Sequence, residues 1–345
     1  MQNLAENLRK GIDLDEESIR RATDLMLDES IDHESKADFL EALSTKGESA
    51  AEIAGFASEF LTRAVEPTFD RNAIGKPLLD VCGTGGDKLN LFNVSTTSVF
   101  VLAAAGVAVV KHGNRGITSK SGGADVLEAL GIKIDLPAEQ FGSCLEEVGA
   151  GFLFAPLYHP AFKAVVPVRK LLAERGQRSI FNLLGPLLNP ARPDYQLIGV
   201  FDPAVGSVFA DILTRLGRKT AWAVHGSAGD AGGMDELSTL GESMIWATDG
   251  SNRVEYNIQP SSLGLTEPAL EELQGGDADK NASILIGILD GTIKGPKRDI
   301  VTLNTAAGLT ICGKAKDLKE GLKIANQAID DGSALSVLKK WQAFA

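Results

Sequence analysis

The residues best suited to chemistry lie between positions 80 and 131, where glycines, hydroxyl groups and basic side chains surround two short apolar segments. Residues 83–86 (GTGG) predict a turn, because glycine accepts backbone conformations that other residues avoid. Asn93, Ser95 and Thr96 then begin an apolar helix. A glycine turn before a hydroxyl-rich helix start presents free N–H groups and the positive end of a helix dipole, which together bind anions. This stretch therefore predicts an anion site.

A second glycine turn follows the same plan. Residues 107–110 predict a buried strand, residues 111–120 a polar loop, and residues 121–123 (SGG) lead into a helix over 125–130. Positions 88–124 contain no Asp or Glu, in a chain whose net charge is −12. The basic residues of this window are Lys88, Lys111, Arg115 and Lys120. An electropositive region concentrates anionic ligands. An ordinary strand–helix turn has a similar local pattern, but two turns in one basic window favour a phosphate site.

A second group of basic residues suits a carboxylate ligand. Between positions 148 and 193 the acid Glu174 stands against six basic residues. These are Lys163, Arg169, Lys170, Arg175, Arg178 and Arg192. Arg169 follows Phe162 by seven residues on a helix predicted over 160–173, so both would share one face. An arginine beside an aromatic ring suits a flat ring bearing a carboxylate. A solvated surface arginine is the alternative.

Two adjacent carboxylates, Asp235 and Glu236, follow a glycine-rich loop. They repel each other unless a cation lies between them, and Mg²⁺ commonly uses one or two protein carboxylates together with substrate phosphates. A plain acidic loop is the alternative, but the predicted phosphate site favours magnesium.

Two histidines lie close to these groups in the sequence. His112 belongs to the basic loop, where its imidazole could hydrogen-bond a substrate or transfer a proton. His159 precedes Pro160 at a predicted helix start, and we interpret it as structural.

The elements that must position these residues predict an α/β fold. Residues 1 to about 65 predict helices only, since apolar side chains recur at helical spacing, as in Ile53, Phe56 and Phe60. Residues 66–76 predict a linker. Strands and helices then alternate, which predicts a mostly parallel sheet. We therefore expect a small N-terminal helical domain over 1–70 and a larger α/β domain over 71–345, with later helices near 165–190 packing on the first.

The expected strands cover 78–82, 107–110, 152–155, 197–201 and 220–224, followed by a hairpin of 244–248 and 254–258. The later helices are expected over 203–216, 278–290, 298–312, 317–330 and 334–342. Ligands of such sheets bind beyond the carboxyl ends of the strands, which is where both glycine turns fall.

Composition restricts the class of protein further. Of 345 residues, 44% are hydrophobic and 23% charged, as in soluble globular enzymes. No apolar run approaches the ~18 residues of a membrane span. The polar, acidic N-terminal sequence predicts neither a signal nor a transit peptide. Three cysteines fit neither a disulfide framework nor a zinc spacing. We therefore expect a cytoplasmic protein that does not bind membranes.

Five segments share their sequence and order with one known family. They are GTGGD (83–87), NVST (93–96), KHGNR (111–115), FNLLGPLLNP (181–190) and MDELS (234–238). Together they resemble the motifs of the anthranilate phosphoribosyltransferases, over essentially the whole chain. The resemblance implies a helical domain on an α/β domain, homodimers that meet through the helical domain, and a magnesium-dependent reaction of tryptophan biosynthesis. In that reaction anthranilate and phosphoribosyl pyrophosphate give N-(5-phosphoribosyl)anthranilate and pyrophosphate.

The resemblance also implies roles for individual residues. Its phosphoribosyl pyrophosphate contacts are Gly83, Gly86, Asp87, Asn93, Val94, Ser95, Thr96, Lys111, His112, Gly113, Asn114, Arg115, Gly116, Ile117, Thr118 and Ser119. Its anthranilate contacts are Gly83, His112, Asn114, Phe162 and Arg169. Magnesium would be bound by Ser95, Asp235 and Glu236. No acid or base is implied; His112, Asn114 and Arg169 position the substrates.

Three positions in the phosphoribosyl site depart from the family pattern. Lys88 replaces a usual glycine, Leu91 a usual threonine and Gly123 a usual serine. Two lost hydroxyls would each weaken substrate binding by about 1 kcal/mol. We expect the charge of Lys88 to compensate.

Two alternatives share this fold. A pyrimidine nucleoside phosphorylase would use phosphate as the nucleophile and would need neither the carboxylate pair nor an arginine for a benzoate. A catalytically inactive relative that binds nucleic acid would need an extended basic surface. A net charge of −12 argues against that surface. The expected partners are therefore the two substrates, without nucleic acid.

Overall fold

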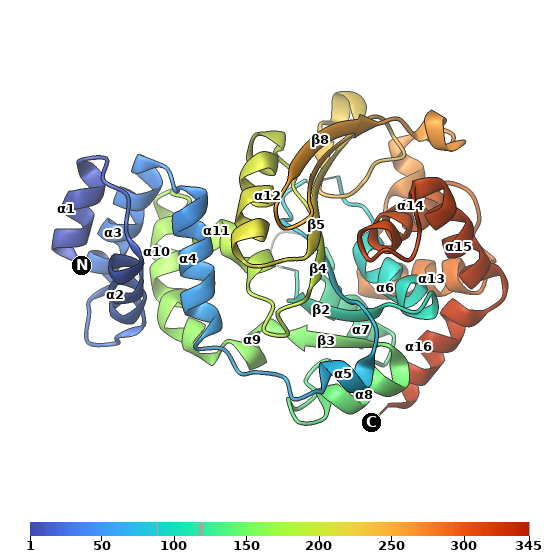
Figure 1. Cartoon of the computed structure of the whole chain (residues 1–345), viewed down its shortest axis with the longest axis horizontal. Helices are drawn as coiled ribbons and strands as arrows, with labels where there is room; N and C mark the ends of the chain where they lie inside the picture. Colours follow the sequence, from blue (N-terminus) through green and yellow to red (C-terminus); the bar gives the residue numbers. More distant parts are fainter. Residues whose placement is uncertain (88, 117–119, 345) are drawn as a thin grey trace.

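The computed structural model describes residues 1–87, 89–116 and 120–344. Four helices form its N-terminal end (Figure 1): α1 (Gln2–Arg9), α2 (Glu16–Leu27), α3 (His33–Lys46) and α4 (Ala50–Leu61). Side-chain caps define where three of them begin. Asp15 and Asp32 accept N–H groups of α2 and α3, and Ser49 forms a capping box with Glu52 in α4. The expected helical lead-in is confirmed.

Two later helices pack on this bundle. They are α10 (Val166–Glu174), against α3, and α11 (Phe181–Leu184), against α4. Leu172 and Phe181 are buried in the same apolar cluster as Phe56 and Phe60. Figure 1 shows α10 between α3 and α4, and α11 on the other side of α4, toward the sheet.

The centre of the molecule is a sheet with strand order β3-β2-β1-β4-β5-β7-β8. Its parallel part comprises β1 (Leu78–Gly83), β2 (Ala108–Gly113), β3 (Ala150–Phe154), β4 (Tyr195–Gly199) and β5 (Thr220–Ser227). Its antiparallel part comprises β7 (Ser243–Thr248), β8 (Arg253–Ile258) and the short β6 (Gly233–Met234), which pairs with β5. The predicted mostly parallel sheet is confirmed, and the predicted hairpin, β7 and β8, forms one edge of it.

Helices cover both faces of this sheet. Apolar side chains of β1, β2 and β4, such as Leu79, Val109 and Leu197, share a core with one group of helices. These are α6 (Val94–Ala104), α7 (Gly123–Ala129), α13 (Ala278–Leu289), α14 (Pro296–Ile311), α15 (Leu318–Asp330) and α16 (Ser333–Ala343). On the opposite face, α12 (Gly206–Arg215) lies between the sheet and α4. The first helices thus reach the sheet through α12 (Figure 1).

Several expected boundaries are wrong. The expected polar loop 111–120 begins as strand, because β2 pairs with β3 as far as Gly113. The single helix expected over 160–173 is a 3₁₀ helix (Pro160–Val165) followed by α10, whose first turn contains Pro167. Proline lacks the N–H that a continuous helix would need there. The expected linker 66–76 contains the short helix α5 (Arg71–Ile74).

Three further elements, α8 (Phe141–Val148), α9 (Ala155–Tyr158) and β6, were not expected from the sequence. Within the described ranges, none of the helices combines the length and apolar character that crossing a membrane would require.

Candidate active site

The strand order reverses next to β1. The chain runs from β1 to β2 and β3 on one side, and then places β4 on the other side of β1. In open α/β sheets, ligands bind beyond the carboxyl ends of the strands at such a point. Gly83 ends β1 and pairs with Gly199, which ends β4. The first glycine turn therefore lies where the topology predicts a ligand.

Three glycines at strand ends make room for the acidic segment. A Cβ atom on Gly83 would lie 2.1 Å from Asp235 Oδ2, and one on Gly199 would lie 1.5 Å from the Asp235 main-chain oxygen. A Cβ atom on Gly226, near the end of β5, would lie 2.5 Å from the Glu236 main-chain oxygen. Any larger residue would collide at each position. Asp235 and Glu236 can therefore cross the ends of β1, β4 and β5 only because these residues are glycines.

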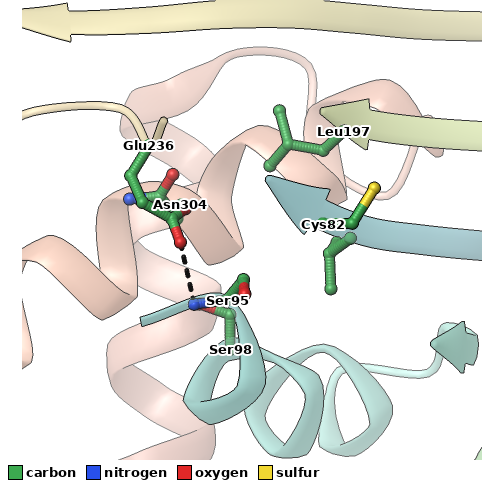
Figure 2. A pocket seen from close by; sticks show the side chains of 7 residues that line it. Cys82, Ser95, Ser98, Leu197, Glu236 and Asn304 are labelled. Carbon is green, nitrogen blue, oxygen red and sulfur yellow. Dashed lines mark hydrogen bonds between the residues drawn. The ribbon is translucent and has the colours of Figure 1, made fainter. Parts of the chain in front are cut away.

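The two carboxylates accept hydrogen bonds from distant parts of the chain. The Gly85 N–H, in the first glycine turn, donates to Asp235 Oδ2 at 2.7 Å. The Ser95 N–H, at the start of α6, donates to Glu236 Oε1 at 3.1 Å (Figure 2). These partners are 150 and 141 residues apart in the sequence. The fold thus brings the predicted metal ligands against the predicted phosphate site.

The carboxyl groups of Asp87, Asp235 and Glu236 influence one another. Dehydration, reinforced by the charge of Asp87, raises the pKa of Asp235 to about 6. Dehydration and the charge of Asp235 raise the pKa of Glu236 well above its usual value, and dehydration raises the pKa of Asp87. A cation beside these oxygens would relieve their repulsion.

The donor set fits magnesium in its chemistry. Carboxylate oxygens and the Ser95 hydroxyl are hard ligands of the kind that Mg²⁺ prefers. In the part of the chain that the structure describes, no group of three or more His, Cys, Asp or Glu side chains is already arranged to hold a metal ion. Asp235, Glu236 and Ser95 would therefore hold the cation together with substrate oxygens.

One residue that positions the acidic segment was not expected from the sequence. Asn304, on α14, accepts the Leu237 N–H at 2.9 Å and donates to the Leu237 carbonyl at 3.0 Å. It also lines the small pocket formed with Ser95 and Glu236 (Figure 2). The available signal was an asparagine within the largely apolar stretch 300–309, because a buried amide needs partners.

A buried ammonium group lies beside the carboxylates. Lys111 Nζ donates to the Val81 carbonyl at 2.6 Å and to Ser95 Oγ at 3.3 Å. Its charge lowers the pKa of Glu236, against the larger effect of dehydration. Nearby, a Cβ atom on Gly123 would lie 3.2 Å from Thr96 Oγ1. With glycine at position 123, where the family pattern has serine, no side chain crowds Thr96 from this position.

Some of the N–H groups that were expected to be free are already hydrogen-bonded: those of Gly85 and Ser95 in the first glycine turn and helix start, and two in the second turn. In the second turn Asp125 accepts the N–H groups of Gly116 at 2.8 Å and Gly122 at 2.7 Å. Arg115 forms two hydrogen bonds with Glu128, at 2.7 and 3.1 Å. The basic window of the sequence therefore meets acidic side chains from outside it in the folded chain.

Two predicted phosphoribosyl residues have structural tasks. The Asn93 side chain donates to the Ser121 carbonyl at 3.1 Å and accepts from Asn281 at 2.9 Å, so it links the two glycine turns. Leu91 forms a β-bridge with Gln274 and packs against the core. This packing accounts for an apolar residue at position 91.

Other predicted contacts surround the same strand ends. Val94 is buried in the first turn of α6, and Gly86 has a φ of 98°, which favours glycine. Gly113 ends β2, and the exposed Asn114 follows it. Lys88, Ile117, Thr118 and Ser119 lie outside the described residues.

His112 and His159 meet at the end of β2. Their ring centres are 5.2 Å apart, and the His159 Nε2–H donates to the Leu188 carbonyl at 2.8 Å. Burial, aided by the charges of His159 and Lys111, lowers the pKa of His112 to about 3. His112 is therefore neutral at physiological pH. Among the described residues its Nε2 atom has no hydrogen-bond partner.

A buried polar network supports this histidine from within the sheet. The fully buried carboxyl group of Asp80, on β1, accepts the His112 main-chain N–H at 3.3 Å. Gln196, on β4, donates to Asp80 at 3.5 Å and accepts from Arg218 at 2.9 Å. Burial raises the pKa of Asp80. These residues were not predicted from the sequence, although a charged residue inside the otherwise apolar strand predicted over 78–82 was a usable signal.

Arg169 is an exposed residue on α10 without a carboxylate partner among the described residues. Partial dehydration lowers its pKa, and within the described part of the chain no charged group opposes this effect. Three of its basic neighbours differ, since Lys170, Arg175 and Arg192 pair with Glu174, Glu34 and Glu66. An unpaired guanidinium group is available to an incoming carboxylate.

Phe162 does not share a continuous helix with Arg169, because the 3₁₀ helix ends at Val165. The prediction that Phe162 and Arg169 share one helical face is therefore wrong. Phe162 packs against His159, Phe60 and Phe181, with ring centres 4.8 to 5.8 Å apart. It connects the histidine pair to the helical bundle.

Comparison with known proteins defines the class. The helical bundle domain model of the glycosyl transferase family matches residues 2–64, and the a/b domain model of that family matches residues 75–335. Together with the site beside β1, these matches define a glycosyl transferase built from a helical bundle and an α/β domain.

Individual relatives narrow the class. The anthranilate phosphoribosyltransferase of Natronomonas pharaonis is 42% identical over 344 residues, covering 100% of this chain and 99% of the relative. The crystal structure of the Thermus thermophilus enzyme of that name has a TM-score of 0.89 and 40% identity, covering 99% and 98% of the two chains. That of Saccharomyces cerevisiae, in complex with phosphoribosyl pyrophosphate and Mg, has a TM-score of 0.83 and 26% identity, covering 95% and 92%. The chain belongs to the anthranilate phosphoribosyltransferase family.

Proposed function

We propose that this chain transfers the phosphoribosyl group of phosphoribosyl pyrophosphate to anthranilate, releasing pyrophosphate, in tryptophan biosynthesis. The observation that carries the proposal is the convergence of Asp235 and Glu236 on the first glycine turn and on the start of α6. Carboxylates that can hold a cation then lie directly against the glycine turn and the helix start that can bind an anion. A diphosphate with its magnesium ion needs both.

The phosphoribosyl pyrophosphate site extends from the first glycine turn to Lys111. The ammonium group of Lys111 lies beside Ser95 and would attract the diphosphate. The remaining contacts of this substrate are those that the family resemblance implies. Magnesium, held by Asp235, Glu236 and Ser95, would supply positive charge to the departing pyrophosphate.

Anthranilate would bind between the end of β2 and α10. Arg169 has no carboxylate partner in the described ranges and would pair with the benzoate. His112, neutral and buried, would line the path to the ribose together with Asn114.

The chemical step requires little acid–base help from the protein. The aromatic amine is a nucleophile in its neutral form, and glycosyl centres react through oxocarbenium-like transition states. The protein's main contribution is then to hold the amine near C1 of the ribose while charge develops on the leaving group. We assign His112, Asn114 and Arg169 to this positioning and no residue to covalent catalysis.

We also propose the division of the molecule that follows from this function. Residues 1–70, with the helices over 165–190, form a helical domain, and residues 71–345 form the phosphoribosyl-binding domain. We propose that two chains meet through the helical domain and that the enzyme acts in the cytoplasm.

Product analysis tests the reaction against its nearest alternative. The protein is incubated with anthranilate, phosphoribosyl pyrophosphate and Mg²⁺, and in parallel with thymidine and inorganic phosphate. We expect phosphoribosylanthranilate in the first mixture and no thymine in the second. Release of thymine without phosphoribosylanthranilate would instead identify a nucleoside phosphorylase.

A further inference from the structure

The carboxylates of Asp235 and Glu236 occupy positions that a phosphate would need. The Gly85 N–H and the Ser95 N–H are the groups through which a glycine turn and a helix start bind an anion. Here they donate to Asp235 Oδ2 at 2.7 Å and to Glu236 Oε1 at 3.1 Å. Gly85 is exposed and Ser95 is half-buried, so an anion arriving from solvent could reach both if the carboxylates turned away.

These contacts differ from ordinary helix capping. In the second glycine turn the acceptor is Asp125, which lies in the first turn of α7 and caps its own helix. Asp235 and Glu236 instead come from a segment more than 140 residues away. Their position against Gly85 and Ser95 is therefore set by the tertiary fold and not by capping within one helix.

The backbone of the acidic segment is held firmly. Asn304 binds both the N–H and the carbonyl of Leu237, and the main chain of Asp235 fits against Gly199. The two carboxylates can therefore leave the N–H groups only by rotation of their own side chains. Figure 2 shows Glu236 extending from this fixed segment toward Ser95.

The charge of Asp87 further disfavours an incoming phosphate. Asp87 lies close enough to Asp235 for the two carboxyl groups to interact. A phosphate that arrives alone would have to displace two carboxylates and then remain beside them. A divalent cation changes both conditions, because it attracts the carboxylates and neutralises the phosphate.

We propose that Asp235 and Glu236 exclude metal-free phosphate anions by occupying the N–H groups of Gly85 and Ser95, and so make the site selective for a diphosphate that arrives with a divalent cation. This role rests on the proposed function and adds to it: the same residues that would hold magnesium also reject the substrate without it. Inorganic phosphate and metal-free pyrophosphate are the rejected ligands.

Calorimetric titration with inorganic pyrophosphate, in EDTA and in Mg²⁺, tests the proposal. Wild-type protein should bind pyrophosphate at least about 100-fold more tightly with Mg²⁺. Glu236→Ala and Asp235→Ala should bind metal-free pyrophosphate about 10-fold more tightly than wild type, although they weaken binding of the magnesium complex. Glu236→Gln and Asp235→Asn keep the shape of the side chains and should show a smaller gain, which also guards against misfolding of the alanine variants.

A charge-matched control separates occupation of the N–H groups from simple electrostatics. Asp87→Asn removes a neighbouring charge but frees neither N–H group, and it should strengthen metal-free binding no more than about threefold. The amide proton resonance of Ser95 in ¹⁵N-labelled protein gives a direct readout. It should shift in Glu236→Ala and shift back when metal-free pyrophosphate is added.

Equal gains in Asp87→Asn and Glu236→Ala would overturn the proposal, as would metal-free binding in the alanine variants no tighter than in wild type. In either case, tight magnesium-dependent binding by the wild type would leave the proposed function standing. If the wild type bound no pyrophosphate even with Mg²⁺ and did not use phosphoribosyl pyrophosphate, the proposed function and this inference would fail together.

Discussion

At the scale of single residues, the site is defined by charges that lack their usual partners. Arg169 has no carboxylate partner in the described ranges, while Asp235 and Glu236 lie beside another acid, Asp87. Crowding of dehydrated carboxyl groups is unfavourable in a protein without ligands, and magnesium would relieve it. The exposed guanidinium group of Arg169 is hydrated, and the benzoate would replace that water.

Replacing Arg169 should affect one substrate. We expect Arg169→Ala to raise the KM for anthranilate about 10- to 100-fold, the range for a lost hydrogen bond between charged groups. The KM for phosphoribosyl pyrophosphate should change less than about twofold. Steady-state kinetics with each substrate varied in turn measures both values, and Lys170→Ala, on the same helix, is the matched control. Parallel increases for both substrates would contradict the assignment.

The depressed pKa of His112 predicts a pH dependence of stability. The folded pKa is about 3, and the unfolded value is about 6.5. Between these values the unfolded chain binds the extra proton, so stability falls as the pH falls below about 6.5. From about pH 8 to pH 5.5 the loss should be about 1 kcal/mol from this residue.

Urea unfolding of wild type and His112→Asn at the two pH values isolates that contribution. The variant should lose about 1 kcal/mol less than wild type on acidification. The comparison is needed because the raised pKa of Asp235 acts in the opposite direction, and because the pKa of His159 is also lowered. Identical pH dependence in the two proteins would show that His112 titrates normally.

At the scale of elements, the ends of the strands position the candidate site more than the helices that follow them do. The glycine turn after β1 and the carboxylate pair were both predictable from composition and spacing. Their contact was not, because Gly85 and Asp235 are 150 residues apart and only the sheet order brings them together. The break at Pro167 was visible in the sequence, yet one helix was expected over 160–173.

The close fit between Gly199 and the acidic segment predicts a strong effect of a single methyl group. In Gly199→Ala the new Cβ would lie 1.5 Å from the Asp235 main-chain oxygen, so the segment must move. We expect a loss of about 1–3 kcal/mol in unfolding free energy and a large rise in the KM for phosphoribosyl pyrophosphate.

Thermal or urea unfolding together with kinetics tests this expectation. Gly241→Ala is the control, because it lies between the same segment and β7 and its Cβ would come no closer than 3.4 Å to Ser227. Wild-type stability and kinetics in Gly199→Ala would show that the acidic segment is not fixed as described.

At the scale of the whole molecule, the α/β class, the helical lead-in and the terminal hairpin all followed from the sequence. The periodic spacing of apolar residues depends only on neighbours in the sequence, so it predicts these elements without knowledge of how distant segments meet. The prediction that residues 88–124 form a basic surface is not met in the folded chain, because Asp125, Glu128 and Glu236 accept hydrogen bonds from residues of this window. Net local charge in a sequence is a poor guide when the acids come from other elements.

The assembly proposed for this chain predicts its mass in solution. A homodimer should sediment at twice 36.4 kDa, and a monomer at 36.4 kDa. Because the proposed contact uses the helical domain, Ile12→Asp, at a 51% exposed apolar residue of that domain, should shift the equilibrium toward monomer. Ile286→Asp, at an exposed position on α13, is the control and should leave the mass unchanged. Sedimentation equilibrium measures the masses, and a wild-type monomer at micromolar concentration would refute the proposed dimer.

The proposed reaction is tested most directly by following anthranilate fluorescence while anthranilate, phosphoribosyl pyrophosphate and Mg²⁺ are mixed with the protein. We expect anthranilate to disappear in a one-to-one ratio with phosphoribosyl pyrophosphate, and EDTA to stop the reaction. A variant carrying both Asp235→Asn and Glu236→Gln should lose most activity and its response to Mg²⁺. Unchanged anthranilate fluorescence with the wild-type protein, or a double variant with wild-type turnover and the same metal response, would contradict the proposed reaction and its metal site.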